Sequence, residues 1–590
     1  MIMKNKFKIF ATILMALMVV SCSEFLNRPT EDSLSSATYY QNDTQVEQGV
    51  NYLYNSPWYD IIRFFIYGGE TMAGNVFEGS SNYITLTVNG TDGDLKNMSY
   101  ALWSVNAHCN TVIQNILNSS GSASKAVKDR AIGEALTWKA MAYFFLVRTF
   151  GDVPIIHDNT AIIKENSYNE VYKVEKADVY DYVILTLEEA LKYLPKKNYI
   201  GQKPRIDYYA AEALLAKVYL TKAGVSGTLN DADLIKARDL AKDVIEYSGR
   251  SLTPKYSDVF RLSPDVYNQT GECLISWLWT ATPQTWTAQN SIQCDVGLVG
   301  FDEFGDLWGD WKGPSVDLQD LFGVSAAENP QSRVNKDDRR QATMMMFGDK
   351  YDYFWTDMGG FDFYRFFYDS DYSPNPTSGA FGCGTGANFA KHLYGNTADH
   401  VAAVGHSPAY MYNSLPTHIL RLSDVYLVYA EACYLTNDAP TALIYVNNVR
   451  RRAHASDLPA LSGVGDIWKE RRLELALEGD NWYDFVRRSY YEMDTVIAEI
   501  KAQRRSVYGG LDDAYKSFVC DEKGKYAGPG TNAWDASGIS YDTTQYQLTD
   551  VKPSMFTMPF PTEDVVLNPN VASTAEPIHV DVRETYSYNF

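Results

Sequence analysis

The sequence predicts a mainly α-helical protein, built as a superhelix of paired helices (α/α) that carries one loop-rich region. Three observations predict this class. Amphipathic stripes with helical spacing recur in both halves of the chain, and two pairs of them have helix–turn–helix proportions. The segment between these pairs lacks helical stripes. With 590 residues, the chain is expected to form two lobes or one large elaborated domain.

The N-terminus is typical of an export signal. A basic start precedes the apolar run 9–20, which is too short to span a bilayer of ~30 Å. The run ends in Val-Val-Ser-Cys, which resembles a bacterial lipoprotein box. We therefore expect a signal peptide at 1–21, lipidation of Cys22 and a polar tether over 22–34; the alternative is an ordinary secretory signal with a chance cysteine. No later segment is long and apolar enough to span a bilayer as a helix. The lipid on Cys22 would therefore hold the protein at a membrane surface.

Four amphipathic helices are predicted in the first half of the chain. The first covers 131–147 and is stopped by the turn containing Gly151. The others cover 177–195, 207–224 and 231–249. Alanines let these helices approach closely, while Leu, Val and Tyr fill the gaps between them.

A second helix pair is predicted at 421–437 and 439–453. Together with the pair at 207–249, it resembles tetratricopeptide-type hairpins, although the strict 34-residue period of such repeats is not kept. Hairpins of this kind usually form a scaffold. Cys433 lies in the apolar stripe of the first helix and is predicted to be a small buried hydrophobic residue.

A loop-rich region extends from about 252 to about 416, between the two helix pairs. It is rich in Gly, Pro, Asn, Asp and aromatic residues. The run 272–280 alternates enough to form a strand. Irregular segments on a rigid scaffold are where binding residues tend to lie. Six of the twelve tryptophans fall in this region: Trp277, Trp279, Trp286, Trp308, Trp311 and Trp355.

Composition and motifs argue against several classes of protein. The formal net charge of −21 repels phosphate backbones and so argues against a nucleic-acid partner. The sequence contains no H-E-x-x-H, G-x-S-x-G or P-loop pattern, and 382-GCGTG-386 is predicted to be a turn. We expect no cofactor and no metal site. The six cysteines after Cys22 form no C-x-x-C motif. The sequence allows one or two disulfides among them but does not decide which cysteines would pair.

The candidate ligand-binding residues are aromatic rings and carboxylates in loops. In 301-FDEFGDLWGDWKGP-314, Trp308 and Trp311 lie among acidic residues without helical or strand periodicity. Flat rings can bury the apolar faces of a sugar, and carboxylates can accept hydrogen bonds from its hydroxyl groups. For each Trp the alternative is a core position beneath a long loop. The predicted set is Trp308, Trp311, Asp306, Asp310, Tyr83 in the loop 80–94, Trp286 and Trp355.

The segment 466–488 is the densest charged motif. It is predicted to be helical, with Glu470, Glu474 and Glu478 in an i, i+4 ladder beside arginines. Charges around most of a helix favour paired ions at a seam between helices. We therefore interpret this segment as structural.

Several of these segments together resemble the SusD/RagB family. The resemblance spans nearly the whole chain, and its motifs occur in the expected order. One departure from the family is at the extreme end of the chain, where a common Gln-Asn-Pro-Gly-Tyr tail is missing. The matching segments are SCSEFLNRP, FFLVRTFGDVPII, AAEALLAKVYL, DDRR at 337–340, RLSDVYLVYAEACYL, VNNVRRRA, ERRLELALEGDNWYDFVRR and MPFPTEDVVLNPN.

The resemblance implies a binding protein without catalytic activity. Family members are lipid-anchored at the outer membrane of Bacteroidetes and present a glycan to a SusC-like TonB-dependent transporter. The implied regions are an N-terminal one at 35–250 and a C-terminal one at 251–590. One alternative is a RagB-like peptide-binding protein. A less favoured alternative is a surface glycoside hydrolase that uses the carboxylates between Asp302 and Asp310.

Overall fold

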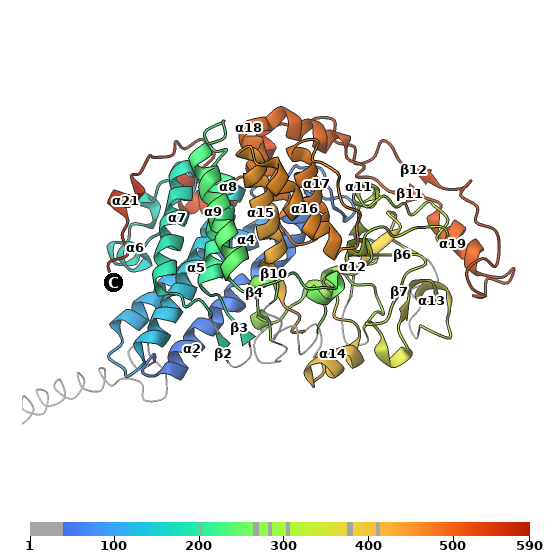
Figure 1. The fold of residues 1–590 in the computed structure, drawn as a ribbon, viewed down its shortest axis with the longest axis horizontal. Coiled ribbons are helices and arrows are strands. Elements are labelled where there is room, and N and C mark those ends of the chain that lie inside the picture. Colours follow the sequence, from blue (N-terminus) through green and yellow to red (C-terminus); the bar gives the residue numbers. More distant parts are fainter. Residues whose placement is uncertain are drawn as a thin grey trace, which may run out of the picture.

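The computed structural model describes residues 39–197, 199–200, 203–262, 271–280, 286–302, 307–373, 381–408 and 413–590. The predicted signal peptide, Cys22, the tether and Asp306 lie outside these residues. The fold is mainly α-helical, as predicted (Figure 1). Among the described residues, no helix is both long and apolar enough to cross a membrane.

The long helices form one continuous array in which each packs against the next (Figure 1). The last helix before the loop-rich region, α9, packs directly on the first helix after it, α15. The predicted scaffold of helical hairpins is therefore confirmed, and the loop-rich region is an insertion into it. In order, the array contains α4 (Gly93–Asn118), α5 (Lys125–Phe150), α7 (Lys176–Tyr193), α8 (Tyr208–Lys222), α9 (Asp231–Tyr247), α15 (Leu422–Leu435) and α16 (Ala439–Arg452).

Local sequence fixes where these helices begin and end. The Asp207 carboxylate accepts a hydrogen bond from the backbone N–H of Ala210 at the start of α8, and Asn230 does the same for Asp233 at α9. Such caps satisfy backbone donors that have no partner inside the helix. α5 ends where Gly151 adopts a φ of 71°, a conformation that residues with a Cβ rarely take.

A two-stranded antiparallel sheet closes the loop-rich region at its base. Strand β4 (Cys273–Trp277), from the start of this region, pairs with β10 (Thr417–Arg421), which follows its end. The strand predicted at 272–280 is thus confirmed. Trp277 and Trp279 are both buried, with ring centroids 5.9 Å apart. The sheet therefore anchors the insertion to the helix array through the core.

The remaining elements are short, except for α18, which has 22 residues. The helices are α2 (Asp43–Asn51), η2 (Ser56–Ile61), α3 (Ile62–Ile66), α6 (Asn159–Glu165), η7 (Trp286–Ala288), α10 (Ile292–Val296), α11 (Val316–Leu321), α12 (Asp338–Thr343), α13 (Phe363–Tyr368), α14 (Thr397–Val404), α17 (Val464–Glu474), α18 (Asn481–Ala502), α19 (Leu511–Val519), α20 (Thr562–Leu567) and α21 (Val582–Thr585). The strand pairs are β1 (Val76–Phe77) with β5 (Gly313–Pro314), β2 (Tyr199–Ile200) with β3 (Lys203–Pro204), β6 (Met344–Met346) with β9 (Ala387–Phe389), β7 (Lys350–Tyr351) with β8 (Phe361–Asp362), and β11 (Tyr508–Gly509) with β12 (Ser540–Tyr541).

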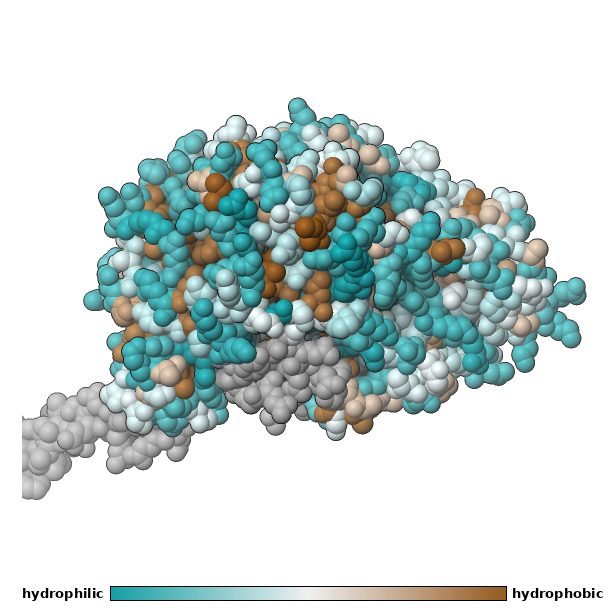
Figure 2. Space-filling view, viewed as in Figure 1, coloured by the Kyte–Doolittle hydropathy of each residue, from teal (hydrophilic) through white to brown (hydrophobic). Residues whose placement is uncertain are grey.

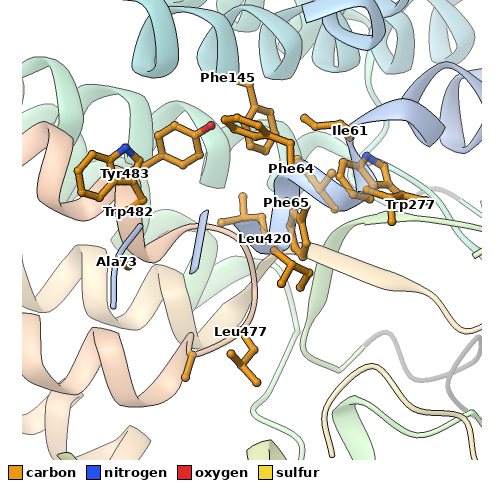
Figure 3. Close-up of a cluster of buried hydrophobic side chains, with 14 of the residues drawn as sticks. Ile61, Phe64, Phe65, Ala73, Phe145, Trp277, Leu420, Leu477, Trp482 and Tyr483 are labelled. Atoms are coloured by element: carbon orange, nitrogen blue, oxygen red, sulfur yellow. The ribbon is translucent and has the colours of Figure 1, made fainter. Parts of the chain in front are cut away.

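The hydrophobic core joins the helix array to the insertion (Figure 3). Phe65 of α3 packs on Trp277 of β4, with ring centroids 5.4 Å apart. On the helical side, Phe145 of α5 contacts Tyr483 of α18 at 5.8 Å. Rings from segments distant in the sequence thus interdigitate, so the insertion and the array share one core.

The charged segment 466–488 is structural, as predicted, but it is not one helix. Helix α17 ends at Glu474 and α18 starts at Asn481, with a turn between them. Leu477 and Gly479 have φ angles of 67° and 74° in this turn, and the buried carboxylate of Glu70 accepts hydrogen bonds from both of their backbone N–H groups. The predicted helical ladder is therefore wrong beyond Glu474.

Buried ion pairs surround this turn. Arg421 pairs with Glu272, Glu474 and Glu478, and Arg452 also pairs with Glu272 and Glu474. These groups come from β10, α16, α17 and the start of β4. The network therefore ties the base of the insertion to the C-terminal helices.

The cysteines and the glycine run fit simple structural roles. None of the six described cysteines forms a disulfide, and Cys433 is fully buried as predicted. The glycine run at 382–386 forms a turn, in which the Gly386 N–H donates to the Cys383 carbonyl. On the face shown in Figure 2, hydrophilic residues dominate and apolar residues form only small separate groups.

Candidate functional site

Trp311 is held at the surface by the loop 307–312. This loop leads into β5, whose pairing with β1 brings it beside Gly79. A Cβ at Gly79 would lie 3.7 Å from Cδ1 of the indole. The ammonium of Lys312 lies 5.3 Å from a Trp311 ring centroid. Trp311 still leaves 46% of its surface exposed, so the ring is supported from the protein side and open to water.

Trp308 is partly buried in the same loop and packs against the core. Its backbone N–H donates to the Cys294 carbonyl at 3.1 Å, and its indole Nε1–H donates to Oδ1 of Asp295 at 3.1 Å. Both acceptors belong to α10. These two bonds fix the orientation of the indole plane.

Trp286 is, with Trp311, one of the two strongly exposed tryptophans among the described residues. It opens η7, exposes 48% of its surface and contacts Tyr59 edge to face, with ring centroids 6.4 Å apart. Tyr59 is half-buried in η2, and burial raises the pKa of its hydroxyl. η7 packs on η2, and α10 packs on α3, which follows η2 directly.

Asp295 connects these parts into one site. Besides Trp308, its Oδ1 lies 3.7 Å from Nε of Arg63 and 3.8 Å from Nζ of Lys312. Lys312 also donates to the Tyr67 hydroxyl at 2.7 Å. The structure therefore places Trp308 and Trp311 at one charged cluster. Trp286 lies against Tyr59 of η2, the helix that runs directly into α3 and Arg63. We call the three tryptophans and this cluster the tryptophan site.

The charges of this cluster are nearly balanced. Arg63 is more than half exposed and lies 3.6 Å from Asp94 as well as near Asp295. Burial lowers the pKa of Lys312, while Asp295 opposes that shift. Burial raises the pKa of Glu78 to about 7, against a hydrogen bond from Ser81. Paired donors and acceptors of both signs suit hydroxyl groups better than a ligand of high charge.

Asp310 lies beside Trp311 but is already used by the fold. Its Oδ1 accepts the Val299 backbone N–H at 2.7 Å, which closes the loop 299–310. Burial raises its pKa, so the carboxylate is partly withdrawn from water. The other predicted acceptor, Asp306, lies outside the described residues.

Tyr83 and Trp355 are core residues, and their predicted role as surface rings does not fit the structure. Tyr83 is 3% exposed, and its hydroxyl donates to the Asp92 carboxylate at 2.5 Å. Trp355 is 4% exposed, and its Nε1–H donates to the Phe301 carbonyl at 2.9 Å. Its ring stacks on Tyr372 with a centroid distance of 5.5 Å. The alternative of a core position therefore holds for Trp355.

Asp302 lacks the exposure that a glycosidase carboxylate needs. It is 3% exposed; Thr397 donates to its Oδ1 at 2.9 Å, and the Tyr394 hydroxyl donates to Oδ2. A retaining or inverting glycosidase needs two carboxyl groups that both reach the sugar. Asp302 and Asp310 do not form such a pair here.

One described group of side chains has the composition of a metal site, away from the tryptophans. Glu175, Asp178 and His579 bring one ligand atom each within 4.8 Å of one another. Asp178 Oδ2 already accepts hydrogen bonds from the ring of His579 at 2.9 Å and from the Val580 N–H at 2.8 Å. These hydrogen bonds join the C-terminal segment to α7. They account for the close approach of the three side chains without a bound ion.

Sequence reasoning missed the polar part of the tryptophan site. Tyr59, Arg63 and Asp295 come from η2, α3 and α10, far from the loop 307–312 in the sequence. Only Tyr59 and Arg63 carried a local signal, because a tyrosine and an arginine fall in a mostly apolar run.

Comparison with known proteins shows the family. The profile described as SusD family matches residues 310–576, and the one described as starch-binding associating with outer membrane matches residues 24–220. A SusD-like protein of Bacteroides ovatus is 30% identical over 96% of this chain and 97% of its own length. This chain belongs to the SusD family.

Solved structures agree with this assignment to the SusD family. A protein crystallised with a xylogluco-oligosaccharide is 26% identical and superposes with a TM-score of 0.73, covering 91% of this chain and 99% of that chain. A laminarin-binding SusD-like protein is 21% identical with a TM-score of 0.57, covering 80% and 96%. The second comparison shows the shared fold.

Proposed function

We propose that this protein binds a neutral glycan at the tryptophan site. The observation that carries the proposal is the placement of Trp308 and Trp311 beside the charged cluster of Asp295. The exposed ring of Trp286 lies against Tyr59 of the neighbouring η2. Aromatic faces cover the apolar C–H faces of sugars. The charged cluster can donate hydrogen bonds to hydroxyl groups and accept hydrogen bonds from them. The family and the oligosaccharide held by a relative support a sugar as the ligand.

The same arrangement supports an uncharged ligand over an acidic polysaccharide. Arg63 and Lys312 are matched by Asp94 and Asp295, and the whole chain carries a formal charge of −21. An anionic ligand would therefore meet no net positive field. Uncharged sugars feel little of that field.

The protein acts, in this proposal, as a binding protein without catalysis. Asp302 is buried and bonded, so among the described residues of the acidic loop it forms no open carboxylate pair with Asp310. Each aromatic ring that covers ~100 Å² of apolar surface contributes about 2.5 kcal/mol before ordering costs. Such modest affinity suits a protein that passes its ligand to a partner.

We further propose that the partner is a SusC-like TonB-dependent transporter in the outer membrane. Lipidation of Cys22 would hold the protein at that membrane, on the cell surface. This part of the proposal rests on the family and on the N-terminal sequence pattern. Co-purification of a tagged full-length chain with a transporter, and its loss from the membrane fraction in Cys22→Ala, would support it.

A polysaccharide panel tests the binding proposal. Purified ectodomain is run through native gels that contain neutral or uronic-acid polysaccharides, while released reducing ends are measured in parallel. We expect retardation by at least one neutral polysaccharide and no rise in reducing ends. Retardation by uronic-acid polymers alone would contradict the neutral-ligand proposal, and a rise that Asp310→Asn abolishes would establish catalysis. Binding of peptides alone would favour the RagB-like alternative.

A further inference from the structure

A cavity lies between α4, α6 and α20, and it shares no lining residue with the tryptophan site. Its volume is about 360 Å³, which is in the range of small-molecule sites. Most of its wall is aliphatic, with Ile162, Ile163, Leu567 and Val571 among the lining residues. Trp103 of α4 supplies an aromatic wall.

Two polar side chains of this cavity carry the argument, Asn106 and Asp564. Asn106 is 1% exposed; its Nδ2 donates to the Ile156 carbonyl at 3.1 Å, while its Oδ1 has no hydrogen-bond partner. Asp564 of α20 accepts a hydrogen bond from the Ser99 hydroxyl at 3.1 Å. No lysine or arginine is among the described residues that line the cavity. A buried acceptor without a donor costs free energy unless a ligand supplies one.

This chemistry fits a cation better than a sugar or an anion. A sugar would place most of its hydroxyl groups against aliphatic side chains, where they would lose hydrogen bonds to water. An anion would meet the Asp564 carboxylate. Burial raises the pKa of Asp564, opposed by the hydrogen bond from Ser99. An ammonium group would pair with the Asp564 carboxylate, and an apolar body would cover Trp103 and the aliphatic wall.

We propose that this cavity binds a small organic amine with an apolar body, which pairs with Asp564 and packs on Trp103. The proposal is independent of glycan binding, since it uses other residues and another ligand chemistry. Three compounds with the same ring and different charges test it: tryptamine, indole and indole-3-acetate. Their affinities for the ectodomain are measured by ligand-observed NMR or by calorimetry at neutral pH.

We expect tryptamine to bind about tenfold or more tightly than indole, as one charge-assisted hydrogen bond predicts, and indole-3-acetate to bind weakest. Asp564→Asn keeps an acceptor for Ser99 but removes the charge, so it should lower tryptamine affinity to that of indole and leave indole unchanged. Trp103→Ala should weaken binding of both compounds. Trp311→Ala, in the tryptophan site, is the matched control and should change neither.

Two results would overturn the proposal. One is equal affinity of the unmodified protein for tryptamine and indole-3-acetate. The other is the absence of saturable tryptamine binding. Both are measured on the native chain, so they do not depend on whether a variant folds. Melting curves of Asp564→Asn and Trp103→Ala confirm that any loss of binding is measured on folded protein.

Discussion

Replacing Trp311 with alanine should separate ligand binding from folding. In the free protein the ring leaves 46% of its surface exposed. A sugar that covers one face removes ~100 Å² of apolar surface from water, which is worth about 2.5 kcal/mol at ~25 cal/mol per Å². Ordering of the ligand offsets part of this gain. We therefore expect the dissociation constant to rise by about 5- to 60-fold, which corresponds to about 1 to 2.5 kcal/mol.

The stability of Trp311→Ala should fall much less than that of a core variant. Trp311 packs on Lys312 and lies beside Gly79, and its outer surface touches nothing. We expect the free energy of unfolding to fall by less than about 2 kcal/mol. Tyr247→Ala is the matched control, since Tyr247 is a strongly exposed aromatic residue at the end of α9. That control should change neither binding nor stability by a comparable amount.

Calorimetric titration with the polysaccharide selected by the gel panel measures the affinity, and urea unfolding measures the stability. The reasoning would be refuted if Trp311→Ala bound the glycan as tightly as the unmodified protein. It would also be refuted if the variant lost more than about 3 kcal/mol of stability, because that loss is typical of a buried tryptophan.

Three further predictions concern stability, each measured as the free energy of unfolding in urea. Trp355→Ala should cost about 3–5 kcal/mol, because the ring is buried and bonded to Phe301; a loss below about 1 kcal/mol would contradict its core position. Glu474→Gln should cost about 3–5 kcal/mol by leaving buried arginines without a charge partner. Burial would raise the pKa of Glu474, but Arg452 and Arg421 lower it well below its ordinary 4.5. Its stabilising contribution is therefore present above pH 4.5 and lost as the pH falls further, and Glu474→Gln should unfold with a weaker dependence on pH in that range. Burial also lowers the pKa of Lys139 to about 7. The unfolded chain then holds this proton more tightly, so stability should rise from pH 7 toward pH 10, and Lys139→Met should remove that rise. An unchanged pH profile in either variant would show that the residue does not titrate as described.

The helix array could be predicted from the sequence because its signal is local. The segment 207–224 is apolar on nearly every side, and the stripe at 231–249 repeats every 3.6 residues. Capping residues such as Asp207 mark where these helices begin. The break between α17 and α18 could not be predicted in this way. It depends on the Glu70 carboxylate, which binds the turn from a distant part of the chain.

The candidate site was predicted only in part, because exposure is a tertiary property. Trp311 and Trp355 both lie in loops rich in aspartate, glycine and aromatic residues, yet one is half-exposed and the other is buried against Tyr372. Nothing local distinguishes them. Arg63 and Asp295 join the site only because α3 packs on α10.

The central claim is that the exposed tryptophans bind a neutral glycan. Calorimetric titration of the unmodified ectodomain and of the double variant Trp286→Ala, Trp311→Ala, with the same neutral oligosaccharide, tests it most directly. The account predicts saturable binding by the unmodified protein and no measurable heat of binding from a double variant that is still folded. Equal binding by the two proteins would contradict it.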